Sequence, residues 1–124
     1  TWWTFEDVGH NDEAQKETGK LLGKKIENYT ELFPKKVNVN FVKVYDKTHI
    51  EVITWERGAG RTLACGTGVT AAAVLSRIFG YTEYKVNVKV PGGQLVIEYD
   101  KEGDDAFMTG PSEKVAEGFY KYKR

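Results

Sequence analysis

Alternating apolar and polar residues run along much of the chain and predict short β-strands. In this period-two pattern, successive side chains point to opposite faces of a sheet. Four segments show it, covering residues 37–45, 49–55, 84–90 and 94–100. The aromatic start of the chain, residues 1–5, predicts one more strand. Pro91 and Gly92 predict a hairpin closed by a type II turn between the last two segments, and residues 101–105 predict the next turn.

Two other segments predict helices of different kinds. Residues 12–29 carry aliphatic side chains on one side of a Lys- and Glu-rich segment, as a surface helix does, although Gly19 and Gly23 weaken it. The charges of this segment are expected to form a solvated face. Residues 68–80 are apolar nearly all round. A surface helix cannot expose such a pattern, so we expect a helix that is enclosed by strands.

These elements together predict an α+β fold. An antiparallel, β-barrel-like sheet is expected to wrap around a central helix with low solvent access. The chain has 124 residues, of which 40% are hydrophobic, and this is enough for one core. Residues 1–124 are therefore expected to form a single domain. The chain begins with Thr1 rather than methionine, which indicates a fragment or a processed chain.

Composition argues against several classes of protein. The chain has 18 Lys and Arg residues and 18 Asp and Glu residues, so its net charge is zero. It therefore lacks the positive charge that would favour a nucleic acid or an anionic membrane as a partner. No apolar run approaches the length of a membrane span. One cysteine and two histidines, His10 and His49, allow no internal disulfide and give no zinc-site spacing. We therefore expect no metal site. The single cysteine also leads us to expect a reducing, cytoplasmic setting.

Cys65, the single cysteine, lies between a glycine-rich loop and the apolar predicted helix. At the start of a helix, the positive end of the backbone dipole favours the thiolate, which an ionised Glu56 nearby would oppose. The N–H groups of residues 66–68 could bind an anion such as a carboxylate. A free cysteine is also commonly a small buried hydrophobic residue. The adjacent glycines and the acid-base pair Glu56 and Arg57 favour a functional site.

Two nucleotide-binding motifs are alternative interpretations of this stretch. Residues 66–71, GTGVTA, fit the pattern G-x-G-x-x-A of dinucleotide-binding folds. Antiparallel hairpins are predicted after them, however, in place of a parallel βαβ unit. The phosphate-binding P-loop is less favoured still, because its lysine is missing.

Four stretches resemble the C-terminal half of the diaminopimelate epimerase family, whose members are cofactor-independent amino-acid epimerases. They are ERGAGRTLACGTG (56–68), FPKKVNVNFV (33–42), VPGGQLVIEY (90–99) and MTGPSEKVAEG (108–118). The family has two pseudo-symmetric halves, each a barrel-like sheet around a helix, and the substrate lies between them. Each half supplies one cysteine. The resemblance implies that no cofactor is needed. It also implies that the N-terminal half of the same enzyme is a partner, and a homodimer is a further alternative.

The resemblance implies that Cys65 and Glu56 act in catalysis. Cys65 matches the second of two cysteines that face opposite sides of the substrate α-carbon. Glu56 matches a carboxylate that assists from the same side and also approaches the substrate. The chemistry is consistent with this, because inverting a stereocentre by proton transfer needs a base on one face and an acid on the other.

The resemblance also assigns substrate contacts. Arg57 matches the ligand of the distal carboxylate of diaminopimelate, and Asn38 matches a substrate-binding asparagine. Without the motif, these two would be interpreted as a loop cation and a polar residue on a strand face. The backbone amides of Gly66 and Thr67 match positions that hold the α-carboxylate. Arg61 departs from the family pattern, which usually has Glu at this position.

We therefore expect an epimerase that interconverts LL- and meso-diaminopimelate, in lysine and cell-wall biosynthesis, by two-base proton transfer. The first cysteine belongs to the N-terminal half, so the chain alone is expected to be inactive. Two alternatives remain. One is a related racemase or isomerase of the same fold. The other is a non-catalytic half-domain that binds an anion or has a structural role.

Overall fold

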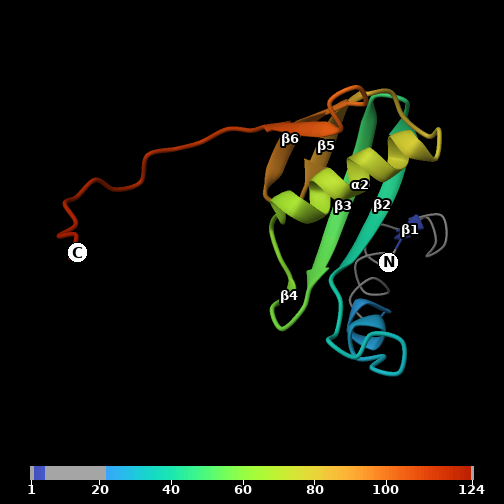
Figure 1. The fold of residues 1–124 in the computed structure, drawn as a ribbon, viewed down its shortest axis with the longest axis horizontal. Coiled ribbons are helices and arrows are strands. Elements are labelled where there is room, and N and C mark those ends of the chain that lie inside the picture. Colours follow the sequence, from blue (N-terminus) through green and yellow to red (C-terminus); the bar gives the residue numbers. More distant parts are fainter. Residues whose placement is uncertain (1, 5–21, 124) are drawn as a thin grey trace.

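A computed structural model describes residues 2–4 and 22–123, in which a β-sheet carries one long helix across its face (Figure 1). The strands follow the order β1-β2-β3-β5-β6-β7, and β4 pairs with β3 beside this path. The elements are β1 (Trp2–Thr4), β2 (Val39–Asp46), β3 (His49–Glu56), β4 (Gly60–Arg61), α2 (Gly66–Ile78), β5 (Lys85–Val90), β6 (Gly93–Asp100) and β7 (Asp105–Thr109). Residues 22–27 are also helical.

The strands predicted from alternation are confirmed as β2, β3, β5 and β6, each within two residues of its predicted bounds. β1 confirms a strand at the start of the chain. The early part of the helix predicted over 12–29 lies outside the described residues, and its end is helical. β4 and β7 were not predicted. β4 is only two residues long, and all five residues of β7 are exposed, so neither has an alternation that the sequence could show.

The α+β class is confirmed, but the prediction of an antiparallel, barrel-like sheet is wrong in two respects. The sheet is mixed, because β1 pairs with β2 in parallel and β3 pairs with β5 in parallel. The path of paired strands runs from β1 to β7 without closing into a barrel. Alternation identifies strands and their faces, but not their order or direction. The connection from β3 to β5 runs through α2, and such a crossover produces parallel strands.

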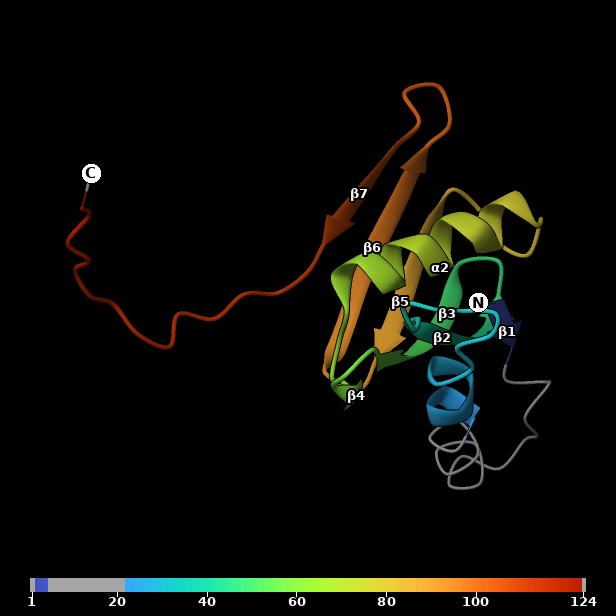
Figure 2. The ribbon, with the colours of Figure 1, turned by 60° about the horizontal axis from the view of Figure 1, so that its bottom comes forward.

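Helix α2 packs one face against the sheet and leaves the other exposed, as the turned view shows (Figure 2). Its buried residues recur at helical spacing and are Gly68, Val69, Ala72, Ala73 and Ser76. On the other side, Leu75 is 36% exposed and Ile78 is 60% exposed. The prediction of a helix with low solvent access all round is therefore wrong for this chain, because the open sheet covers only one side of it.

Two apolar clusters occupy the two faces of the sheet. The larger lies between the sheet and α2 and consists of Val42, Ile50, Val52, Val69, Ala72, Ala73, Val86, Val88, Val90 and Ile97. On the opposite face, Val39 and Phe41 pack with residues that include Leu22, Ile26 and Trp55. Each fully buried aliphatic side chain contributes roughly 1.5–3 kcal/mol to folding. The first cluster fixes α2 on the sheet.

The hairpin between β5 and β6 is confirmed, but its turn is not type II. Val90 pairs with Gly93, which leaves Pro91 and Gly92 in the turn. A type II turn needs a positive φ at Gly92, whereas the positive φ, 149°, belongs to Gly93. Gly92 has another role: its N–H donates to the Leu63 carbonyl at 2.8 Å. The hairpin thereby supports the loop that leads into α2.

Candidate active site at the start of helix α2

Cys65 lies at the start of α2, as predicted. It is the N-cap residue, with an extended backbone (φ −134°, ψ 104°), and its carbonyl accepts the N–H of Val69 at 2.8 Å. The half-buried thiol forms no capping bond, and its Sγ lies 3.5 Å from Thr67 Oγ1. The first N–H groups of a helix have no acceptor within the helix. The thiol is therefore placed beside unpaired backbone donors.

Close packing between Gly68 and Asn40 seats the start of α2 on β2 and β3. A Cβ atom at position 68 would lie 2.5 Å from Asn40 Oδ1. The same oxygen accepts the Thr54 hydroxyl at 2.7 Å, across the paired strands. Gly68 therefore leaves room for the Asn40 side chain. Asn40 was missed because a polar residue on a strand gives no sign of its partner.

Gly68→Ala is expected to destabilise the fold. Alanine favours a helix by about 1 kcal/mol over glycine, but overpacking a tight contact costs about 1–3 kcal/mol. The new Cβ would push Asn40 away from Thr54, so we expect a net loss of up to about 2 kcal/mol in the free energy of unfolding, measured with urea. Gly66→Ala is the matched control, because a Cβ there would meet only the end of the flexible Met108 side chain, its methyl at 3.3 Å and its sulfur at 3.6 Å. Equal losses in both variants would contradict the prediction.

Glu56 ends β3 on the sheet face that α2 covers. Side chains alternate along a strand, so Glu56 shares this face with Thr54 and Val52, which are both buried. Its Oε1 accepts the Thr62 hydroxyl at 2.8 Å. In the described part of the chain, no hydrogen bond joins the Glu56 carboxylate to the Cys65 thiol. Both residues are half-buried, and the helix that Cys65 caps lies on the sheet face to which Glu56 belongs.

Asn38 and Arg57 are joined by a hydrogen bond beside Glu56. The Arg57 backbone N–H donates to Asn38 Oδ1 at 2.8 Å, which leaves the Asn38 NH₂ group free to donate elsewhere. The Arg57 guanidinium donates from Nη1 to the Lys35 carbonyl at 2.9 Å. Its other N–H groups lie on an exposed side chain. The structure thus brings three predicted site residues together where β3 ends.

Glu27, which the sequence did not indicate, fixes the loop that follows Arg57. It is only 6% exposed. One carboxylate oxygen accepts Trp55 Nε1–H at 2.7 Å, and the other accepts the N–H of Gly58 at 2.8 Å. Gly58 has a φ of 78°, which favours glycine. The hydrogen bond from Trp55, followed by that from Gly58, lowers the pKa of Glu27 below its ordinary value.

A glutamate in a Lys- and Glu-rich helix normally lies on a solvated face, which is why Glu27 was overlooked. The only signal lay in Gly23, which had been considered a weakness of this helix. A Cβ at position 23 would lie 2.6 Å from Cγ of Trp55. The glycine therefore lets the Trp55 indole pack against the helical residues 22–27, where it reaches Glu27.

We expect Glu27→Gln to lower the midpoint of urea unfolding at pH 7, because an amide has one acceptor oxygen in place of two. The native pKa of Glu27 lies below its ordinary value of 4.5, so its ionised form stabilises the fold above about pH 4.5. That contribution is lost as the pH falls through the native pKa. The difference in urea midpoint between wild type and Glu27→Gln should therefore become smaller below about pH 4.5. Glu98→Gln, at an exposed position of β6, is the control. A difference in urea midpoint between wild type and Glu27→Gln that stays constant down to pH 3 would contradict the role of the Glu27 carboxylate.

The glycines of residues 66–71 lie inside a helix and do not form a nucleotide-binding turn. A parallel βαβ unit is present, contrary to the prediction, since β3 and β5 are parallel and α2 connects them. Two other observations argue against a dinucleotide-binding turn. Residues 57–65 separate β3 from α2, and neither Gly66 nor Gly68 has a positive φ. A dinucleotide fold needs its first glycine in the tight turn directly after the strand.

The described residues contain no group of three or more His, Cys, Asp or Glu side chains that could hold a metal ion. Their helices include none long and apolar enough to cross a membrane. The site contains one thiol, one carboxylate, a guanidinium and backbone donors at a helix start. Arg57 and Thr67 are exposed, so this group of residues lies open to solvent. Such a set can exchange a proton with a ligand that lies against it and can bind carboxylates.

Comparison with known proteins identifies related sequences. The family model described as diaminopimelate epimerase matches residues 6–115. A diaminopimelate epimerase of Alkalilimnicola ehrlichii is 50% identical over 107 residues, which cover 86% of this chain and 38% of that protein. The enzyme of Acetivibrio thermocellus is 48% identical over 97 residues, covering 78% and 34%, and that of Methanococcus maripaludis is 48% identical over 88 residues, covering 71% and 32%. The chain spans about a third of the length of these relatives.

The fold is also found in a solved structure. The crystal structure of the Bacillus anthracis phenazine biosynthesis protein, PhzF family, matches with a TM-score of 0.51 over 82% of this chain and 30% of that one. Its sequence is 17% identical, so this likeness shows the fold alone. The match to the family model and the identity to the curated relatives together show that the chain belongs to the diaminopimelate epimerase family.

Proposed function

We propose that this chain is the C-terminal half of an epimerase that interconverts LL- and meso-diaminopimelate. The observation that carries the proposal is the position of Cys65, the N-cap of α2, on the sheet face where Glu56 ends β3. Family membership supports the substrate. The rest of such an enzyme would supply the opposite wall of the site, with a second cysteine. The single free thiol fits a reducing compartment, and we place the enzyme in the cytoplasm.

In this proposal the substrate α-carbon lies beside Cys65. The thiolate takes the α-proton, an S–H bond forms, and the C–H electron pair passes into the α-carboxylate. The N–H groups of Gly66 and Thr67 bind that carboxylate and stabilise the added charge as it develops. The second cysteine donates a proton to the other face, which inverts the stereocentre. In the reverse direction Cys65 is the proton donor, and Glu56 assists the transfer from the same side.

The distal end of diaminopimelate would be bound by Arg57 and Asn38. A guanidinium presents N–H groups that match the two oxygens of a carboxylate. One N–H of Arg57 is already directed to the Lys35 carbonyl, which orients the side chain and leaves other donors for the ligand. Recognition of a second carboxylate is the feature that would separate a diaminopimelate epimerase from a racemase of simpler amino acids.

The test compares the 124-residue chain with the full-length protein that contains it. With LL-diaminopimelate as substrate, we expect meso product from the full-length protein and none from the chain alone, because one face of the carbon then has no acid or base. Full-length protein that is folded but inactive on both isomers would overturn the proposal. Activity of the isolated chain would show that a second cysteine is not needed.

A further inference from the structure

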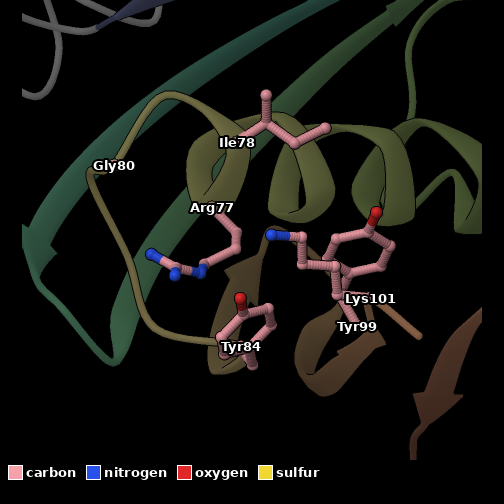
Figure 3. Close-up of a pocket in the computed structure, with 6 residues that line it drawn as sticks. All are labelled: Arg77, Ile78, Gly80, Tyr84, Tyr99 and Lys101. Carbon is pink, nitrogen blue, oxygen red and sulfur yellow. The ribbon is translucent and has the colours of Figure 1, made fainter. Parts of the chain in front are cut away.

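A pocket of about 280 Å³ lies at the far end of α2 from Cys65. It is lined by Arg77, Ile78, Gly80, Tyr84, Tyr99 and Lys101 (Figure 3). These residues come from the last turn of α2, the loop after it, the approach to β5, the end of β6 and the turn that follows β6. Since α2 has 13 residues, the pocket lies about 20 Å from the thiol at a rise of about 1.5 Å per residue. It is separate from the proposed catalytic site.

Two tyrosines form a fixed aromatic wall in this pocket. The rings of Tyr84 and Tyr99 are stacked, with centroids 6.3 Å apart and planes 29° apart. Their backbones are joined, because the Tyr99 N–H donates to the Tyr84 carbonyl at 2.8 Å. The Tyr99 hydroxyl donates to Asp104 at 3.1 Å. The wall is therefore positioned before any ligand arrives.

Two cations lie beside this wall. The guanidinium carbon of Arg77 is 4.1 Å from the centroid of the Tyr84 ring, and its Nη1 donates to the Thr82 carbonyl at 3.3 Å. Lys101 is exposed and extends into the same space (Figure 3). Within residues 22–123, neither cation forms an ion pair. A hydrogen bond from the Arg77 side chain, supported by its positive charge, lowers the pKa of Tyr84.

The carboxylates of Glu83, Asp100 and Asp104 act on the pocket residues from outside the lining. No carboxylate belongs to the lining residues. Glu83 is close enough to interact with Arg77, and the C-terminal end of α2 also carries partial negative charge. Asp104 already accepts the Tyr99 hydroxyl. The two cations belong to the pocket lining and the carboxylates do not, so a small ligand inside the pocket lies closer to the positive charges.

We propose that this pocket binds a small organic anion that consists of one aromatic ring with a phosphate or carboxylate group. The anionic group lies between Arg77 and Lys101, and the ring lies against the tyrosines and Ile78. The volume is just below the range of about 300–1,000 Å³ that is usual for ligand pockets, so it suits one ring and not a nucleotide. Diaminopimelate does not fit this description, because it has no aromatic ring and its two ammonium groups balance the charge of its two carboxylates.

The test is an NMR titration of the full 124-residue chain with ¹³C-labelled tyrosine rings. The probes are phenyl phosphate and benzoate. With either one we expect saturable shifts at Tyr84 and Tyr99 and a Kd on the order of 1 mM. Arg77→Gln and Lys101→Gln should each weaken binding at least about tenfold, which is the scale of one charge-assisted hydrogen bond. Lys43→Gln is the matched control, because Lys43 lies 5.1 Å from the Tyr45 ring centroid but outside the pocket.

Benzyl alcohol and inorganic phosphate separate the two parts of the proposal. Benzyl alcohol bound as tightly as benzoate would overturn the role of the anion, and inorganic phosphate bound as tightly as phenyl phosphate would overturn the role of the ring. Unchanged affinity in both Arg77→Gln and Lys101→Gln, with folding checked by urea unfolding, would also overturn it. None of these outcomes involves epimerase activity, so they leave the proposed function to its own test.

Discussion

Replacing Cys65 with serine in the full-length enzyme is expected to lower kcat by about 10²- to 10⁴-fold, the usual contribution of a positioned acid or base. A serine hydroxyl is a far weaker acid than a thiol and does not supply the anionic base that the reaction needs. Substrate affinity should change little, because Arg57, Asn38 and the first-turn amides remain. The fold should also remain, since serine is a favoured N-cap residue and Cys65 itself forms no capping bond.

Steady-state kinetics in both directions measures this effect, with the isomers separated by chiral chromatography. Ala71→Ser is the matched control, because it adds a hydroxyl group to an exposed position of the same helix, away from the site. We expect its kcat to stay within about twofold of wild type, since an exposed surface substitution has little effect. Cys65→Ser with wild-type kcat would remove Cys65 from the chemistry.

Arg57→Ala should have a different kinetic signature. The proposed contact is with a carboxylate remote from the reacting carbon, so its loss weakens ground state and transition state alike. We expect KM for diaminopimelate to rise about 10- to 100-fold, in keeping with a lost hydrogen bond between charged groups, while kcat falls little. The loop should keep its shape, because the bond from Arg57 to Asn38 uses the backbone N–H, which alanine retains.

Arg57→Lys is the informative comparison for this residue. It keeps the charge but loses the planar fork, so its KM should lie between those of wild type and Arg57→Ala. Lys43→Ala, a cation outside the site, controls for loss of charge. A large fall in kcat with an unchanged KM would contradict the role in substrate binding and would place Arg57 near the reacting carbon.

The sequence predicted the strands of this fold better than their arrangement. Period-two alternation is a local property, so it located β2, β3, β5 and β6 and identified their buried faces. Strand order and direction depend on the long connections, and the parallel pairing of β3 with β5 through α2 was not foreseen. The apolar residues of α2 were read correctly as a signal for burial, but the open sheet covers only one side. Leu75 and Ile78 remain exposed on the other.

The candidate site shows the same division between local and tertiary information. The position of Cys65 at the helix start followed from neighbouring residues and is confirmed. The roles given to Cys65, Glu56, Arg57, Asn38, Gly66 and Thr67 stay predictions. Asn40 and Glu27 could not be found from the sequence, because their partners, Gly68, Trp55 and Gly58, lie far away along the chain. Gly23 and Gly68 lie at these contacts, but the sequence does not show which residue packs against each glycine.

The central claim is that Cys65 exchanges a proton with the substrate α-carbon on one face only. The most direct measurement follows deuterium incorporation at that carbon in heavy water, for LL- and meso-diaminopimelate separately, in full-length wild type and Cys65→Ala. For wild type we predict exchange that accompanies inversion of both isomers, and for Cys65→Ala we predict loss of epimerisation in both directions. If Cys65→Ala exchanged and epimerised both isomers at the wild-type rate, the account would be contradicted, and Cys65 would be a structural residue.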